Sequence, residues 1–346
     1  MAVSFSVPAA RWALACLVAL LALLALSADV VSAAPAHDEG IVVDSDAGLN
    51  VKQIVQKRGY DIEEHKVVTA DRYILTMFRL PKSYDETQRN VSAAPNKPAV
   101  YLIHDAGYDV WLGNNRGTTW SPMINYVLNV SKRPTLSYIG HSEGTMQAFA
   151  GFSANQEVAR RVSYFGALAP VAYLGGVTSP VFVALAETYV DKLVDLLGVN
   201  EFFGKSPIIQ DVIGKFGCAF VDEACDSIIN LLTGPSENVN KTRIHVYISQ
   251  TPAGTSNKAV YGTFEPPEYD LSKMKYPRTA FFTGQKDWLA TSSDTAKLRV
   301  RLPAGTIVSE KSTRFNHLDF TWASNANDLI YKDIIAQVKQ FEGKGY

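Results

Sequence analysis

A serine flanked by glycines is the strongest chemical signal in the chain. Ser142 stands in the pentapeptide GHSEG at residues 140–144, between an apolar run at residues 136–139 and a helix-compatible stretch at residues 143–153. A strand, a tight turn and a helix in this order form a nucleophile elbow, in which flanking glycines avoid clashes between the two backbones. We therefore predict that Ser142 points its hydroxyl outward as a nucleophile. The alternative is an ordinary loop serine.

A serine hydroxyl attacks well only when a base accepts its proton and a third group orients that base. On an α/β-hydrolase fold, the acid and then the histidine follow the serine along the chain, each after a strand. Asp287 follows a strand-like stretch at residues 278–283, and His317 follows another at residues 306–310. The order and spacing predict His317 as the general base and Asp287 as the orienting acid.

Other histidines and carboxylates compete for these two roles. The remaining histidines lie before Ser142 or in the middle of the chain: His37, His65, His104, His141 and His245. For the acid, Asp294 falls on a predicted helix, whereas Asp319 is only two positions from His317 and is predicted to cap a helix or loop. A purely structural histidine is the alternative role for His317.

Strands that alternate with helices are expected to position these residues. The pattern predicts a mostly parallel sheet flanked by helices, an α/β-hydrolase fold, because such alternation is typical of βαβ units. The antiparallel hairpin is predicted at residues 64–68 and 73–80, and residues 81–98 are predicted to form a surface loop. The remaining predictions are strands at 100–103, 108–112, 136–139, 163–168, 278–283 and 306–310 and helices at 51–57, 123–130, 143–153 and 325–341.

A helical region interrupts this alternation. Residues 181–197 carry apolar side chains at helical spacing with acidic residues on the other side, which is typical of an amphipathic helix. We predict that residues 171–260 form a helical cap over the site, inserted into a hydrolase core of residues 34–170 and 261–346. Ordinary helix packing without a capping role is the alternative.

The N-terminus predicts export. Arg11, an apolar run at residues 13–26 and small residues at 31–33 resemble a secretory signal peptide spanning residues 1–33, and the run is short for a membrane anchor. In an oxidising compartment Cys218 and Cys225 are expected to form a disulfide, with two free thiols as the alternative. Sequons for glycosylation begin at Asn90, Asn129 and Asn240. The expected location is secreted or lysosomal (vacuolar), with no transmembrane segment after removal of the signal.

The composition argues against several other classes of protein. The chain has 346 residues and a formal net charge of −1, without a basic cluster, so nucleic acid is not an expected partner. We find no pattern of metal ligands and no phosphate-binding loop in the sequence. Because chemistry of the serine-histidine-acid type needs no cofactor, none is expected.

Several longer runs make the chain similar to a known family. Residues 105–114 (DAGYDVWLGN) and 316–320 (NHLDF), together with the GHSEG pentapeptide, resemble the acid lipase family of α/β-hydrolases, the group of gastric and lysosomal acid lipases. The resemblance extends over about residues 51–341. It implies Ser142 as nucleophile, Asp287 as acid and His317 as base, and it implies neutral lipid esters, triacylglycerols or sterol esters, at a lipid–water interface as substrates.

The chain departs from this family at three places where segments are missing. Between residues 100–103 and 108–112 the family carries a loop and helix, and the loop supplies one backbone N–H of the oxyanion hole; the other comes from Glu143. Because only a short link is present here, we predict that both strands cannot keep their usual places. We also expect that the second donor, near Asp105, is lost and catalysis impaired. The stretches at 120–123 and 258–262 are also shortened, so the sequence is interpreted as a shortened isoform or an imperfect gene model.

Two alternative functions remain open from the sequence. One is a carboxylesterase or thioesterase that acts on soluble acyl esters. The other is a catalytically impaired isoform that keeps the pocket and cap but mainly binds lipid. Acyl-chain preference, head-group preference and oligomeric state are not encoded in any recognisable pattern.

Overall fold

The computed structural model describes most of the predicted hydrolase core and parts of the predicted cap. The described residues are 45–46, 49–68, 74–101, 109–113, 120–187, 201–202, 229–239, 254–255 and 268–346. The predicted signal peptide, Cys218, Cys225 and Asn240 lie outside these residues, and so does Asp105.

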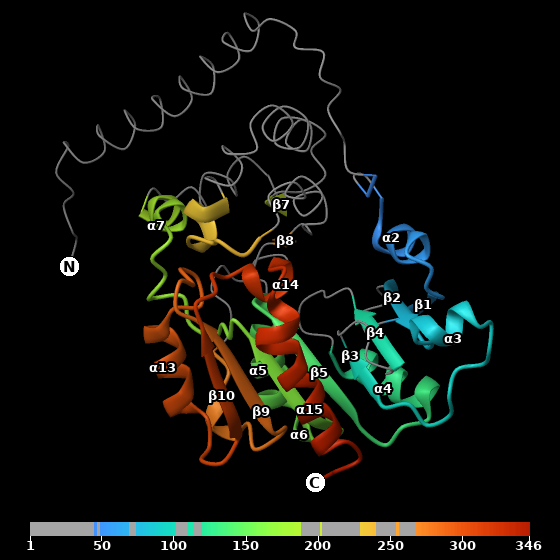
Figure 1. Cartoon of the computed structure of the whole chain (residues 1–346). Coiled ribbons are helices and arrows are strands. Elements are labelled where there is room, and N and C mark those ends of the chain that lie inside the picture. Colours follow the sequence, from blue (N-terminus) through green and yellow to red (C-terminus); the bar gives the residue numbers. More distant parts are fainter. Residues whose placement is uncertain are drawn as a thin grey trace, which may run out of the picture.

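An eight-stranded sheet forms the centre of the fold, in the order β1-β2-β4-β3-β5-β6-β9-β10 (Figure 1). The pairs from β4 to β10 are parallel, whereas β1 and β2 form an antiparallel hairpin and β2 pairs antiparallel with β4. This confirms the predicted mixed but mostly parallel sheet. The strands are β1 (Glu63–Val68), β2 (Ile74–Leu80), β3 (Ala99–Tyr101), β4 (Asp109–Gly113), β5 (Leu136–His141), β6 (Val162–Leu168), β9 (Thr279–Gly284) and β10 (Ile307–Thr313).

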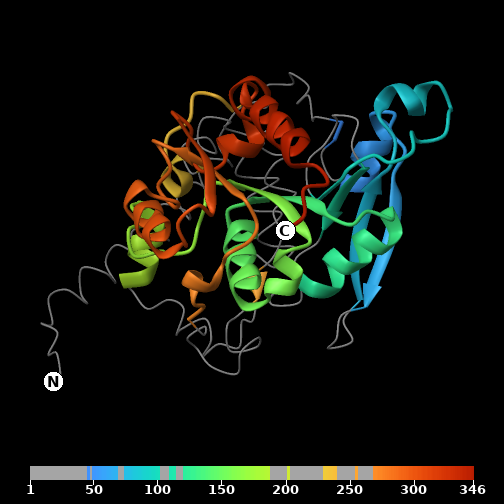
Figure 2. The same cartoon turned by 90° about the horizontal axis from the view of Figure 1, so that it is seen from below.

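Helices cover both faces of this sheet, and each face has its own apolar core. One core contains Ile124 and Phe149 from α4 and α5, and the other contains Ile334 and Val338 from α15. Seen from below, α5 and α15 lie on opposite sides of the strands (Figure 2). The helices are α2 (Val51–Lys57), α3 (Tyr84–Gln88), α4 (Trp120–Ser131), α5 (Glu143–Ala154), α6 (Gln156–Ala159), η3 (Leu271–Lys273), α13 (Ser292–Arg301), α14 (Asp319–Trp322), η4 (Asn327–Tyr331) and α15 (Lys332–Phe341).

The predicted displacement of the strands at 100–103 and 108–112 is wrong. Strand β3 pairs in parallel with β4, with Ala99 opposite Asp109 and Tyr101 opposite Trp111, and residues 102–108 alone link the two. The prediction treated the usual length of a crossover as a minimum. A chain spans about 3.3 Å per residue and adjacent strands are about 4.8 Å apart, so a link of this length is long enough to join two adjacent parallel strands.

Two local predictions also need correction. The predicted loop at 81–98 contains α3, whose first turn is closed by a capping box between Ser83 and Glu86. At the C-terminus the predicted helix begins as a π-helix, η4, before α15. Within η4, Leu329 is exposed and Ile330 is buried.

Parts of the predicted cap are seen beyond the carboxyl ends of β9 and β10. Helix α7 (Pro180–Glu187) follows β6, and the strand pair β7 (Glu201–Phe202) and β8 (Gly254–Thr255) belongs to the same stretch of chain (Figure 1). Residues 229–233 are helical and lead into an irregular segment up to residue 239. Within the described residues, no helix has the length and apolar character needed to cross a membrane.

Candidate active site

Ser142 lies in the sharp turn between β5 and α5. Its φ of 53° and ψ of −116° are unusual for a residue with a side chain, which is the backbone strain expected at a nucleophile elbow. A Cβ on Gly140 would lie 2.9 Å from backbone atoms of Gly144, so the first glycine is required. Among the described residues outside its own helix, the one contact of a Cβ on Gly144 would be with the Tyr138 hydroxyl, at an ordinary 3.6 Å, so the predicted clash at the second glycine is not found there.

The structure brings Ser142, His317 and Asp287 together from three separate loops. The Nε2 atom of His317 lies 2.6 Å from the Ser142 Oγ, and its Nδ1 atom lies 2.9 Å and 3.0 Å from the two carboxylate oxygens of Asp287. Both His317 and Asp287 are buried. With a proton on Nδ1, the imidazole directs Nε2 at the serine, which is the geometry that a general base requires.

The Asp287 carboxylate is fixed by its own loop. Its Oδ1 accepts hydrogen bonds from the backbone N–H groups of Leu289 and Ala290, at 2.9 Å and 2.8 Å. These bonds hold the carboxylate toward the histidine. Asp287 therefore has the orientation of an acid that holds its base in one tautomer.

The two rival carboxylates have other partners. Asp294, in the first turn of α13, accepts from the Gly176 N–H at 2.7 Å and pairs with Lys297 at 2.9 Å. Asp319 accepts from the Asn316 N–H at 2.9 Å and the Asn238 side chain at 3.0 Å. Asp319 thus stabilises the loop that carries His317, in line with the capping role predicted for it.

A second histidine, missed as a functional residue by the sequence analysis, supports the first. The Nε2–H of His141 donates to the backbone carbonyl of His317 at 2.7 Å, and the two rings lie 5.1 Å apart. Burial, and repulsion from His317, lower the pKa of His141 to about 4. A neutral His141 therefore ties the nucleophile elbow to the histidine loop. In the sequence, the position of His141 next to Ser142 was the only feature that pointed to this role.

Of the two predicted oxyanion-hole donors, only Glu143 falls among the described residues. Glu143 is the first residue of α5, so its backbone N–H lies at the positive end of the helix, directly after the nucleophile. The predicted second donor falls within residues 102–108, outside the described residues. Of the predicted glycosylation sites, Asn90 and Asn129 are exposed. In the part of the chain that the structure describes, no cluster of metal-ligating side chains is found.

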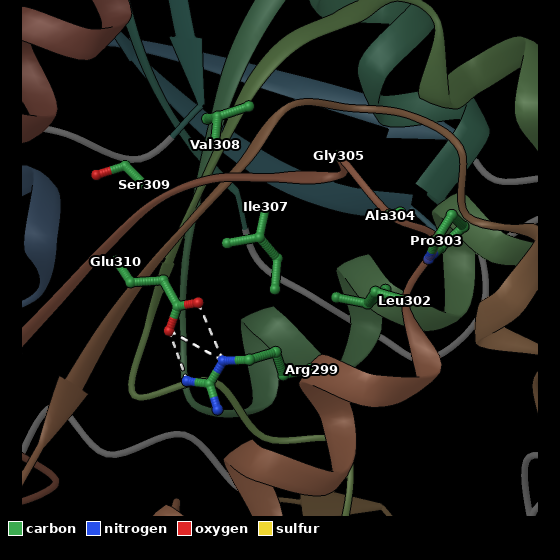
Figure 3. A pocket seen from close by; sticks show the side chains of 9 residues that line it. All are labelled: Arg299, Leu302, Pro303, Ala304, Gly305, Ile307, Val308, Ser309 and Glu310. Carbon is green, nitrogen blue, oxygen red and sulfur yellow. Dashed lines mark hydrogen bonds and ion pairs between the residues drawn. The ribbon is translucent and has the colours of Figure 1, made fainter.

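A shallow pocket of about 420 Å³ lies elsewhere on the surface (Figure 3). It is lined by the end of α13, the following turn and the start of β10, and the Arg299 guanidinium pairs with the Glu310 carboxylate at one side of it. None of the three residues Ser142, Asp287 and His317 lines this pocket. Because β10 separates it from the His317 loop, it is not part of the candidate active site.

Known proteins resemble this chain over most of its length. Residues 51–105 match the family model described as a partial alpha/beta-hydrolase lipase region. Lysosomal acid lipase/cholesteryl ester hydrolase of Rattus norvegicus is 31% identical, over 87% of this chain and 94% of the relative. The protein of that name from Homo sapiens is 30% identical, over 88% and 96%. Gastric triacylglycerol lipase of Rattus norvegicus is 28% identical, over 85% and 93%.

The alignments also show that the relatives are longer within the shared region. The alignment with the Homo sapiens protein extends over 391 residues, more than the 346 residues of this chain. The relatives therefore carry internal segments that are missing here. Among solved structures, an esterase of Pyrococcus furiosus superposes with a TM-score of 0.44 at 13% identity, over 84% of this chain and 94% of the other. Because relatives of 30% identity and more align with most of this chain, the chain belongs to the acid lipase family of α/β-hydrolases, a family of carboxylic ester hydrolases.

Proposed function

We propose that this protein is a serine ester hydrolase, a lipase, which cleaves neutral lipid esters such as triacylglycerols or sterol esters. The observation that carries the proposal is the continuous hydrogen-bonded chain from Asp287 through His317 to the Ser142 hydroxyl. The substrate class is supported by the names of the relatives, which are triacylglycerol lipases and cholesteryl ester hydrolases.

In the proposed reaction, Ser142 Oγ attacks the ester carbonyl while His317 Nε2 accepts the hydroxyl proton. Asp287 stabilises the imidazolium that forms, and the Glu143 N–H donates to the oxyanion of the tetrahedral intermediate. His317 then gives the proton to the departing alkoxide, and an acyl-enzyme remains on Ser142. Water, deprotonated by the same imidazole, releases the fatty acid and restores the serine.

The expected setting is a lipid–water interface in a secreted or lysosomal compartment. The support is the predicted signal peptide at residues 1–33 and the names of the relatives, which include lysosomal and gastric lipases. Residues 171–260 are proposed to cap the site, with a disulfide between Cys218 and Cys225 and glycosylation at Asn90, Asn129 and Asn240.

The direct test is hydrolysis by the purified protein and its Ser142→Ala variant, on short and long acyl esters from acidic to neutral pH. We expect turnover by the natural sequence and a loss of at least about 1,000-fold in the variant, because the nucleophile is gone. Equal turnover by both would refute the role of Ser142. A sharp rise in rate above the solubility limit of the ester supports a lipase, whereas saturation on monomeric ester indicates a carboxylesterase or thioesterase.

One observation favours an impaired, lipid-binding form as the second candidate. The link between β3 and β4 is reduced to residues 102–108, where family members supply an oxyanion donor. Loss of one donor lowers kcat by roughly 100 to 1,000-fold. Stoichiometric labelling of Ser142 by a phosphonate ester combined with slow turnover would indicate this form, and fast turnover would exclude it.

A further inference from the structure

A short segment of the predicted cap contacts both loops that carry the histidine and its acid. The backbone carbonyl of Thr233 accepts two hydrogen bonds, from the N–H of His317 at 3.2 Å and from the N–H of Trp288 at 3.4 Å. Trp288 directly follows Asp287 in the sequence. One carbonyl oxygen therefore joins the loop after β9 to the loop after β10, next to the residues whose side chains pair.

Gly234 allows this segment to approach so closely. Its φ is +100°, a conformation that side-chain-bearing residues rarely adopt, and a Cβ at this position would overlap the carbonyl oxygen of Lys286. The same Cβ would lie 3.3 Å from Trp288 Cγ. Any other residue at position 234 must therefore push the segment away from the Asp287 loop.

Side chains of the His317 loop bind the same segment. Asn316, which is fully buried, donates from Nδ2 to the Gly234 carbonyl at 2.7 Å and to the Thr233 hydroxyl at 3.2 Å. The buried carboxylate of Asp319 accepts from the Ser236 hydroxyl and from the Asn238 side chain. Each of these buried polar groups has a partner, so the contact between the two segments is specific and costly to break.

The hydrogen bond between Ser142 and His317 is not permanent. When Ser142 carries an acyl group it has no proton to donate, so this bond cannot hold the imidazole during the second half of the reaction. Asp287 and His317 also come from different strands, and a displacement of about 1 Å at such a pair can lower the rate by roughly 100-fold. Contacts made by residues other than the reacting ones are therefore needed to keep Asp287 and His317 aligned.

We propose that residues 233–238 form a positioning clip, which holds the Asp287 and His317 loops in register throughout the reaction. Thr233 and Gly234 contact both loops, whereas Ser236 and Asn238 bind Asp319, next to the histidine loop. This inference rests on the proposed function of the site. Part of the predicted cap would then support proton transfer between Ser142 and His317, in addition to covering the active site.

The test compares Gly234→Ala with Gly305→Ala. Gly305 also has a positive φ, of +82°, but a Cβ there would meet no atom of the described residues within 4 Å, and Gly305 precedes β10 whereas His317 follows it. Both variants therefore carry similar backbone strain, and only the first disturbs the clip. We expect kcat on a soluble ester to fall roughly 10 to 100-fold in Gly234→Ala with KM nearly unchanged, and to stay within about 2-fold in Gly305→Ala. Equal kcat values for the two variants would overturn the clip.

A second pair of variants covers the case that Gly234→Ala does not fold. Thr233→Val removes the hydroxyl that accepts from Asn316 but keeps the side-chain shape, and Thr233→Ser restores the hydroxyl. We expect Thr233→Val to lower kcat and the rate of Ser142 labelling by a phosphonate by roughly 5 to 10-fold, and Thr233→Ser to recover most of both. A loss in both variants, or in neither, contradicts the proposal.

A spectroscopic measurement separates failure of the clip from failure of the proposed function. A proton held between His317 Nδ1 and Asp287 gives a far-downfield proton NMR resonance. This signal should be sharp in the natural sequence and in Gly305→Ala and broadened by exchange in Gly234→Ala, whether or not the protein hydrolyses esters. If the natural sequence is inactive while the signal differs in this way, only the proposed function fails. If hydrolysis occurs and the signals are identical, only the clip fails.

Discussion

The candidate site depends on a few side chains whose roles can be separated by substitution. Asp287, Asp294 and Asp319 are all buried carboxylates near the carboxyl end of the sheet, yet only Asp287 bonds the histidine that faces Ser142. The sequence favoured Asp287 through its place after a strand. It did not reveal His141, because a bond from a side chain to a distant backbone carbonyl leaves no pattern in the sequence.

Replacing the proposed acid should separate it from its rivals. Asp287→Asn is expected to lower kcat by roughly 10,000-fold near neutral pH, because an amide no longer selects the tautomer with the proton on Nδ1. Asp294→Asn makes the same chemical change in a carboxylate that bonds Gly176 and Lys297, so its kcat per folded molecule should stay within about 3-fold. Steady-state kinetics of both variants measures the difference. The reverse order of effects would assign the role to Asp294.

His141 should make the stability of the fold depend on pH. Its pKa is lowered from 6.5 to about 4 in the folded chain, so unfolding takes up a proton between these values. The free energy of unfolding should therefore decrease as the pH falls from about 6.5 to about 4, by on the order of 3 kcal/mol from this residue. His141→Gln keeps a donor without titrating, so its urea-unfolding free energies should vary less over this range. If the free energy of unfolding changed with pH by the same amount in both proteins, the role of His141 would be contradicted.

Helices and strands were predicted correctly where a clear pattern of apolar residues lies next to a turn signal in the sequence. Strand β5, the elbow and α5 were predicted because apolar residues, two glycines and a helix-compatible stretch follow one another directly. The prediction that the strands at 100–103 and 108–112 cannot both keep their usual places was wrong, because adjacent parallel strands can be joined by a link shorter than the usual crossover. The π turn of η4 was also missed, since a single inserted residue barely changes an apolar pattern.

The close approach of β3 and β4 can be tested at Gly113. A Cβ on Gly113 would overlap the buried ring of Tyr101, which stacks on Tyr138 with ring centroids 5.3 Å apart. Gly113→Ala should therefore destabilise the fold by about 1 to 3 kcal/mol, the usual cost of overpacking. Gly345→Ala is the matched control, because a Cβ at this position would meet no atom of the described part of the chain within 4 Å. Equal stability of the two variants in urea would show that the strands do not pair as described.

In the molecule as a whole, segments that are far apart in the sequence meet at the carboxyl ends of the parallel strands. The order of elements along the chain predicted the fold class. It also predicted that Ser142, Asp287 and His317 lie close together, because each follows a strand of the same sheet. The clip at residues 233–238 could not be predicted in this way. Its contacts are backbone carbonyls and a tight glycine in a region without regular alternation, so nothing in the sequence distinguished them from an ordinary loop.

Two internal deletions of different length should have different effects on hydrolysis. Replacing residues 188–228 by a flexible Gly/Ser linker keeps the clip, and we expect hydrolysis of soluble esters to persist while the rate increase on emulsified lipid is lost. Extending the deletion to residue 238 removes the clip, and hydrolysis of both substrates should then fall by at least about 100-fold. Activity of folded protein on the two substrates is the measurement. Full esterase activity in the longer deletion would contradict the role of the clip.

The anchoring of the histidine loop through a few backbone atoms has a consequence for how such proteins diversify. Thr233 engages both loops through its main-chain oxygen, so this contact does not depend on the identity of its side chain. Substitutions elsewhere in the predicted cap should therefore leave this contact in place, so the part of the cap proposed to contact the acyl chain can be exchanged without disturbing the proposed path of proton transfer.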